Sequence, residues 1–242
     1  MNIKYNNHTP EEYGAWLATR PVITPSELEI DRYKIPGRQG ELIGQTQTRG
    51  NAHITFKLHT KASSGTASLD SAINWITTPG GYLQFYKSGE YDNYKFEVIT
   101  SEVKSIEDLA DDYIRAEIEM EVYPFKYKVS GTQSGRIVQP GGLITFNISS
   151  SKCEPLYMFE CTLVSGKFTV NGYEMFVKQG SGIYVDVRRK LTYTMISSVK
   201  QNQDDKINGD YDGITLKSGY NQLSTSDGVT LTIVDSREGY II

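Results

Sequence analysis

The stretch that decides the fold is Ala116-Glu117-Ile118-Glu119-Met120-Glu121-Val122, in which apolar and acidic residues alternate without a break. Successive side chains of a β-strand point to opposite faces, so the three glutamates share one face and the apolar residues share the other. A strand with this pattern lies half buried, with one face on a core and one face toward water. We therefore expect a mainly β protein.

The composition agrees with this expectation. The 242 residues include 17 tyrosines and 22 glycines, which is typical of strands and tight turns. The 25 basic and 29 acidic residues nearly cancel, so no strong field attracts nucleic acid or an anionic membrane. No apolar run approaches the length that crosses a bilayer or marks a signal peptide, and we expect synthesis in the cytoplasm. Cys153 and Cys161 are expected as free thiols, with one bridge between neighbouring strands as the alternative.

The N-terminal region predicts a helix followed by a long arm. Thr9 is a helix cap, Pro10 stands at the first helical position and a glutamate follows three residues after the cap, which predicts a helix over residues 9–17. Residues 28–60 predict two strands on either side of Pro36-Gly37-Arg38-Gln39-Gly40. The second ends in a stretch in which apolar and polar residues alternate. We expect a long hairpin here.

A second helix and another hairpin come next. The helix is indicated by apolar residues at helical spacing, which are Leu69, Ala72, Ile73 and Ile76. Thr66 or Ser68 is expected to cap this helix, and the Pro-Gly-Gly of residues 79–81 to end it, so that it lies across a sheet. Residues 82–86 and 94–99 predict the hairpin, and Pro124 is expected to end the alternating strand described first.

Residues 130–135 are polar and contain two glycines, and we place a boundary there between domains 1–130 and 131–242. The sequence of the second domain predicts short strands at close intervals. These are residues 143–148, 156–163, 167–170, 173–177, 182–187, 192–196, 221–224 and 229–234. Such spacing favours a β-sandwich or jelly roll. Asn171-Gly172 is the strongest turn, because both residues tolerate the positive φ of a two-residue hairpin.

Catalytic and metal-binding patterns are mostly missing. His53 and His59 face the same side of one expected strand, but no third ligand for a metal is identified. Residues 208–213 match the first half of a calcium loop without its final glutamate, and we interpret them as a turn. No nucleophile elbow, phosphate loop or dinucleotide fingerprint occurs. The row Glu117, Glu119 and Glu121 is interpreted as a solvated face, with a glycosidase pair or a channel lining as alternatives. We expect no enzyme and no cofactor.

The order of these features resembles the distal tail protein family of long-tailed, non-contractile bacteriophages. The residues that carry the resemblance are Glu12-Tyr13-Gly14, the extended segment 21–29, Ile35-Pro36-Gly37-Arg38-Gln39-Gly40-Glu41, Trp75-Ile76, Tyr82-Leu83, the strand 118–127 and Gly219-Tyr220-Asn221-Gln222-Leu223. The likeness is strong to about residue 128 and looser after it.

The resemblance implies a homo-hexameric ring, single or stacked as two, built by domain 1–130 at the tip of the tail tube. A galectin-like β-sandwich, domain 131–242, would project as a docking platform. The implied partners are the tail tube protein, the end of the tape-measure protein, and the tail-tip and receptor-binding proteins, with no membrane. The implied place is the virion tail tip, and DNA would pass through the ring without specific binding.

Site residues follow from the same reading. Pro36, Gly37, Arg38, Gly40 and Arg49 are assigned to a contact between subunits, with a simple surface turn as the alternative for the Pro-Gly-Arg element. The glutamate row is assigned to the channel wall. The alternative function is a carbohydrate-binding adhesion module of the tail tip. The region after residue 135 contains no tryptophan to stack on a sugar, which weighs against that alternative.

Overall fold

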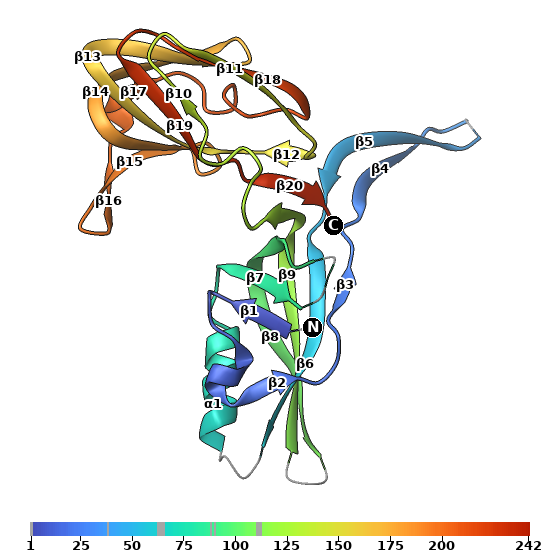
Figure 1. Cartoon of the computed structure of the whole chain (residues 1–242). Coiled ribbons are helices and arrows are strands. Elements are labelled where there is room, and N and C mark those ends of the chain that lie inside the picture. The colour runs from blue at the N-terminus through green and yellow to red at the C-terminus, as the bar shows by residue number, and fades with distance from the viewer. Residues whose placement is uncertain (1, 38, 62–65, 88, 90, 110–112) are drawn as a thin grey trace. The chain divides into compact units, whose positions relative to one another are not determined.

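The computed structural model describes residues 2–37, 39–61, 66–87, 89, 91–109 and 113–242 (Figure 1). The chain forms two units, Met1–Lys126 with Ile241–Ile242, and Tyr127–Tyr240. Most elements of both units are β-strands in antiparallel pairs, and α1 is the one α-helix among the described residues. The expectation of a mainly β fold is confirmed. Whether 1–130 and 131–242 act as separate domains stays a prediction.

The first unit is a sheet with the order β1-β7-β8-β9-β6, to which β2 and β3 add along the outer edge of β6. Its elements are β1 (Asn2–Tyr5), the 3-10 helix η1 (Pro10–Tyr13), β2 (Ala15–Leu17), β3 (Val22–Thr24), β4 (Leu28–Lys34), β5 (Glu41–Arg49), β6 (Ala52–Lys61), α1 (Thr66–Ile76), β7 (Tyr82–Tyr86), β8 (Tyr94–Leu109) and β9 (Tyr113–Lys128). β4 and β5 form a separate two-stranded sheet.

One face of this sheet is the core. β6 lies antiparallel to β9 from Ala52 opposite Val122 to Lys61 opposite Tyr113, so their alternating apolar residues fall on the same face. The helix α1 covers that face with Leu69, Ala72 and Ile76, as its spacing predicts (Figure 1). The predicted 82–86 and 94–99 hairpin is also confirmed, as β7 and β8.

The helix expected over residues 9–17 is wrong in its second half. The cap forms as predicted, since the Thr9 N–H donates to Glu12 Oε1 at 3.0 Å. The helix ends at Tyr13 and is capped by Gly14, whose φ of 68° is left-handed, and Ala15–Leu17 pair with β6 instead. Hydrogen bonding to the edge strand of the sheet therefore outweighs the local preference for a helix at Ala15–Leu17.

The second unit is built around two long strands, β13 (Leu156–Val170) and β14 (Tyr173–Asp186). Its main sheet has the order β10-β19-β13-β14-β15-β16, with β18 joining β11 to β13, and β17 on β14. Its other elements are β10 (Ile137–Val138), β11 (Leu143–Ile148), β12 (Lys152–Cys153), β15 (Leu191–Ile196), β16 (Val199–Asn202), the 3-10 helix η3 (Asp204–Lys206), β17 (Ile207–Asn208), β18 (Gly219–Thr225), β19 (Val229–Asp235) and β20 (Glu238–Ile241).

The short strands expected at 156–163 and 167–170 are one strand, and so are those at 173–177 and 182–187. Register shifts around Cys161 allow β13 and β14 to stay paired through the polar interruption that reads as a turn in the sequence. The Asn171-Gly172 turn is confirmed, with φ of 51° and 89° between the paired residues Val170 and Tyr173.

The segment expected as a linker is packed against its own unit. The Thr132 N–H donates to Glu238 Oε1 at 2.7 Å, and the Ser236 N–H donates to Ser134 Oγ at 3.1 Å. Pro124 does not end its strand, because β9 continues to Lys128. Proline lacks an N–H but keeps its carbonyl, so it can still accept a hydrogen bond within a sheet. The Pro124 carbonyl accepts one from the Ile242 N–H at 3.1 Å.

Both cysteines are free and buried, so the thiol interpretation is confirmed and the bridge is not formed. Burial raises the pKa of the Cys153 thiol well above its ordinary value, and its Sγ lies 2.6 Å from the Ser236 carbonyl oxygen. A buried, protonated thiol is unreactive, so Cys153 is a packing residue. Cys161 is buried in the same core.

Candidate assembly surfaces

The first candidate surface is the arm, which we define as strands β4 and β5 with their connecting turn. Within the described residues, these strands pair only with each other, from Leu28 opposite Arg49 to Lys34 opposite Glu41. The predicted hairpin is therefore confirmed, but it is shorter than 28–60, because β6 belongs to the main sheet. Gly37 and Gly40 have φ of 81° and 91°, which explains why the turn uses glycine.

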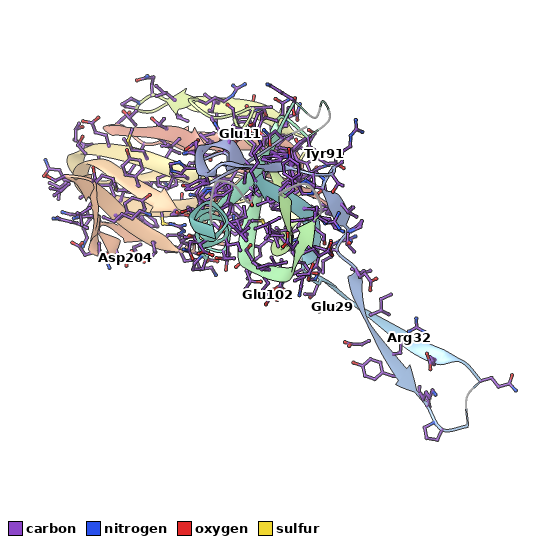
Figure 2. All side chains as sticks on the ribbon, turned by 90° about the horizontal axis from the view of Figure 1, so that it is seen from below. Glu11, Glu29, Arg32, Tyr91, Glu102 and Asp204 are labelled. Carbon is purple, nitrogen blue, oxygen red and sulfur yellow. The ribbon has the colours of Figure 1, made fainter. Side chains whose placement is uncertain are left out.

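The arm exposes apolar side chains. Ile30, Tyr33 and Ile35 are 42%, 57% and 41% exposed. The charged side chains on the arm interact weakly: Glu41 lies 3.7 Å from Arg32 and 3.9 Å from Lys34, and Figure 2 marks Arg32 on this ribbon. Such exposed ion pairs contribute little to stability. None of the arm's side chains that the structure describes is buried. A two-stranded ribbon on its own is marginal in water.

The base of the arm is fixed to the segment that precedes it. Arg49 Nη1 donates to the Ser26 carbonyl at 3.3 Å, and the Gly50 N–H donates to the Glu27 carbonyl at 3.0 Å. Arg49, which we assigned to a subunit contact, therefore has a role within its own chain. Its place in an interface stays a prediction.

The tip of the arm holds the other residues assigned to that contact. Pro36 and Gly40 line a shallow hollow of about 370 Å³ together with Lys34, Ile35 and Glu41. Arg38 lies outside the described residues. The structure therefore places Pro36, Gly37 and Gly40 at one exposed turn, and it leaves their role in assembly as a prediction.

The second candidate surface is the charged face, which we define as the side of β6, β8 and β9 opposite the core. Glu117, Glu119 and Glu121 lie on it as predicted. They are matched by partners that the alternation alone did not reveal: Lys57 Nζ lies 3.2 Å from Glu117, Lys104 Nζ lies 3.6 Å from Glu119, and Asn51 Nδ2 donates to Glu121 at 2.6 Å.

Further pairs extend the charged face along β8 and β9. Lys104 also lies 3.0 Å from Glu102, labelled in Figure 2, and this contact raises the pKa of the lysine. Arg115 forms hydrogen bonds to Glu107, which hold the pKa of that carboxyl below its ordinary value. The face therefore carries alternating charges instead of a field of one sign.

The two histidines lie on the same face without forming a metal site. His53 Nδ1 is 3.3 Å from Glu119 Oε1. Burial, with help from nearby Arg115, lowers the pKa of His59, whose ring meets Trp16 edge to face at 6.2 Å. Among the described residues, no three His, Cys, Asp or Glu side chains are grouped so as to hold a metal ion.

The third candidate surface was missed from the sequence. It is a groove of about 580 Å³ in the second unit, beside the exposed ring of Phe176, with lysines around it. A signal was present, because Glu174, Phe176 and Lys178 alternate with the core residues Met175 and Val177. The phenylalanine therefore occupies an outward position, where a core role is excluded.

No family model matches this sequence, and no curated protein sequence matches it. Solved structures do match. The Dit protein of phage SPP1, described as a paradigm of the hub adsorption apparatus in phages that infect Gram-positive bacteria, has a TM-score of 0.65 at 12% identity, covering 95% of this chain and 96% of Dit. This is the fold of a phage tail hub protein. The resemblance inferred from the sequence is thus confirmed at the level of the fold.

Two further matches to this hub fold come from the baseplate of phage P2 in its activated conformation. The structure with Ca matches at TM-score 0.58 and 10% identity, covering 96% of this chain and 98% of the other. The structure with Sr matches at 0.54 and 11%, covering 93% and 92%. The match therefore extends over both units. Among the described helices, none has the length and apolar character needed to cross a membrane.

Proposed function

We propose that this chain is a structural distal tail protein of a long-tailed, non-contractile phage or prophage. Its place would be the virion tail tip, where it forms a hexameric hub between the tail tube and the host-adhesion apparatus. The observation that carries this proposal is the hub fold over 95% of the chain, both units included. The chain would be made in the host cytoplasm and would have no enzymatic activity.

The arm supports ring formation. Its exposed Ile30, Tyr33 and Ile35 gain from burial at about 25 cal/mol per Å² of apolar surface, and one chain does not supply that burial. A head-to-tail contact, in which each arm packs on the next subunit, uses two different surfaces and closes into a ring when the rotation fits. Pro36, Gly37 and Gly40 at the tip, and Arg49 at the base, would set the arm's direction.

The charged face supports a channel wall. Its glutamates are interleaved with Lys57, Lys104 and Arg115, so the wall would present hydrated charge without a continuous basic stripe. DNA binding depends on many lysines and arginines that neutralise successive phosphates. A wall of mixed charge would let DNA pass through the ring without holding it.

The second unit would be the docking platform. We propose that the galectin-like sandwich and the outer surfaces of the ring bind the tail tube protein, the end of the tape-measure protein, and the tail-tip and receptor-binding proteins. No membrane contact is needed. Support comes from the baseplate structures of phage P2, which are assemblies and match over both units.

Light scattering coupled to gel filtration tests the proposal. The purified chain should have a mass about six times, or about twelve times for two stacked rings, the 27.2 kDa of one chain. The double variant Ile30→Ser, Tyr33→Ser should elute as a single chain. The matched control is Ile196→Ser, Val199→Ser, which removes equally exposed apolar side chains from β15 and β16 of the second unit.

Electron microscopy of the same samples should show rings for the parent and for the control, and none for the arm variant. A parent that stays a single chain at high concentration would exclude the ring. An arm variant that keeps the parent's mass would remove the arm from the subunit contact, leaving the fold as the sole support for the hub.

A further inference from the structure

The groove of the second unit lies on the outer face of its sheet, at the join of β13, β14 and β17. Phe176 is 51% exposed there, while its neighbours Met175 and Val177 are fully buried in the core. Lys167 of β13 and Asn208 of β17 stand directly opposite Phe176, one on each side, so the three side chains share a face. The lining of the groove thus contains an exposed aromatic side chain with a polar residue opposite it on each side.

About half of the Phe176 side chain thus remains open to water. Exposed aromatic surface within a concave site lined by a few polar groups is typical of ligand-binding pockets, whose volumes run from about 300 to 1,000 Å³. The groove, at about 580 Å³, falls within that range. Leu163 and Ile207 add apolar surface to its lining.

The groove is positively charged in a chain whose net charge is −4. Its described lining contains Lys167, Lys178 and Lys206 but one acid, Asp227. Lys167 is paired with Glu174, which stands just outside the lining. For Lys178 and Lys206, the structure shows no ion pair with any described residue. Two ammonium groups are therefore available to a ligand.

The pairing of β14 limits how a peptide could bind in the groove. A peptide that binds by strand addition needs an unpaired strand edge. At Phe176 and Val177, β14 already pairs with β13 on one side and with β17 on the other. Strand β14 therefore offers no free edge to a ligand at Phe176 and Val177.

We propose that this groove binds an anionic saccharide, with a sugar ring stacked on Phe176 and its phosphate or carboxylate held by Lys178 and Lys206. The C–H groups of a sugar's flat face carry partial positive charge and match the negative face of an aromatic ring. Lysine binds phosphate and carboxylate as a point charge and needs no fixed geometry. The missing tryptophan, which weighed against sugar binding, is replaced in this role by a phenylalanine.

Calorimetric titration of the full chain tests the proposal with four probes. Two are anionic saccharides, a glucosylated glycerol-phosphate oligomer and a glucuronate oligomer, which separate phosphate from carboxylate recognition. The others are a neutral glucose oligomer of the same length and a glutamate peptide of the same charge. At least one anionic saccharide should bind, and its affinity should fall by about tenfold or more as salt rises from about 0.05 M to about 0.5 M.

The variants should separate the two parts of the site. Phe176→Ala should weaken binding of the anionic saccharide at least about tenfold, and so should Lys178→Gln with Lys206→Gln, which should also remove most of the salt dependence. The matched controls are Tyr220→Ala and Lys200→Gln, an exposed aromatic and an exposed lysine outside the groove, and these should bind like the parent.

Three results would overturn the proposal. They are the absence of binding by both anionic saccharides, equal or tighter binding of the glutamate peptide, and unchanged affinity in Phe176→Ala. Circular dichroism of each variant shows whether it is folded. Should Phe176→Ala fail to fold, Phe176→Tyr keeps the stacking face and Phe176→Leu keeps the volume, and the proposal requires tight binding by the first and weak binding by the second. The inference does not depend on ring formation.

Discussion

Two hairpins of this molecule, the arm and the pair β13–β14, have similar local chemistry and opposite environments. Both are long antiparallel pairs that turn at glycines with positive φ. In β13–β14, Phe168, Val170 and Met175 are completely buried in the core of the second unit. In the arm, the apolar side chains of Ile30 and Tyr33 remain exposed.

This contrast shows which interactions stabilise a pair of strands. Backbone hydrogen bonds form in both hairpins, yet each contributes only about 1 kcal/mol net, because the unfolded chain bonds to water instead. Burial of one face supplies the larger part of the stability. Among the side chains that the structure describes in the two hairpins, only those of β13–β14 are buried within one chain. Under the proposed function, the arm would gain this burial from the neighbouring subunit. The following measurements test this contrast, in order of decreasing effect.

The largest effect is expected from Phe168→Ala. Removing a fully buried phenylalanine should lower the free energy of unfolding of the second unit by about 3–5 kcal/mol. Urea unfolding followed by near-ultraviolet circular dichroism of the tyrosines measures this. Tyr33→Ala is the control in the arm and should change nothing in the single chain. Equal losses in both variants would contradict the contrast.

Glu238→Gln should cost about 2 kcal/mol at neutral pH. Glu238 is fully buried and accepts hydrogen bonds from Thr132, Ser236 and Lys128. Burial by itself would raise its pKa, but these bonds outweigh it and hold the pKa below the ordinary value. Because the folded-state pKa is the lower one, this stabilisation is complete above the unfolded-state pKa of about 4.3 and is lost as pH falls through the folded-state pKa.

Urea unfolding from about pH 7 to about pH 3 checks the effect of Glu238. The parent should lose stability more steeply on acidification than the variant, and the two curves should converge at low pH. Parallel curves would show that Glu238 is not ionised in the folded state.

Gly172→Ala should cost about 1 kcal/mol. The turn needs φ of 89° there, and a methyl group would meet no atom within 4 Å, so the cost is backbone strain alone. Gly40→Ala in the arm meets the same conditions, with φ of 91°. Native-state hydrogen exchange should show weaker protection of β13 in the first variant and no change of any core strand in the second.

The smallest effect is expected from Glu41→Gln, which removes the arm's exposed ion pairs with Arg32 and Lys34. The loss should be under about 0.5 kcal/mol by urea unfolding. Glu174→Gln removes an equally exposed pair with Lys167 from β13–β14 and should be just as mild. A large loss in only one of the two would show that surface charge, and not burial, separates the hairpins.

Local signals predicted much of the fold. The alternation at 116–122, the helix over Leu69 to Ile76 and the Asn171-Gly172 turn were all correct, because each pattern has one low-energy interpretation. The errors came from distant partners. Ala15, expected in a helix, pairs with Thr60 of β6 instead. The β-bulges that allow β13 to continue as one strand depend on its pairing with β14.

The candidate sites were predicted less completely, for the same reason. The glutamates of β9 were placed on the right face, but Lys57 and Lys104, which balance them, come from other strands. Arg49 binds Ser26, which no local pattern indicates. Phe176 could have been found from the alternation of β14, whereas its groove requires β13 and β17 beside it.

The order of the strands has a consequence for how the chain reaches its final form. Asn2 pairs with Tyr86, and Ile137 pairs with Thr232. Neither sheet can therefore be completed until residues far along the chain have been synthesised. Closing such long loops is slow, and proteins dominated by distant contacts fold in milliseconds to seconds. Lys34 meets Glu41 just seven positions later. The arm is thus among the earliest elements able to form during synthesis. Under the proposed function, it would be stabilised only later, when subunits assemble.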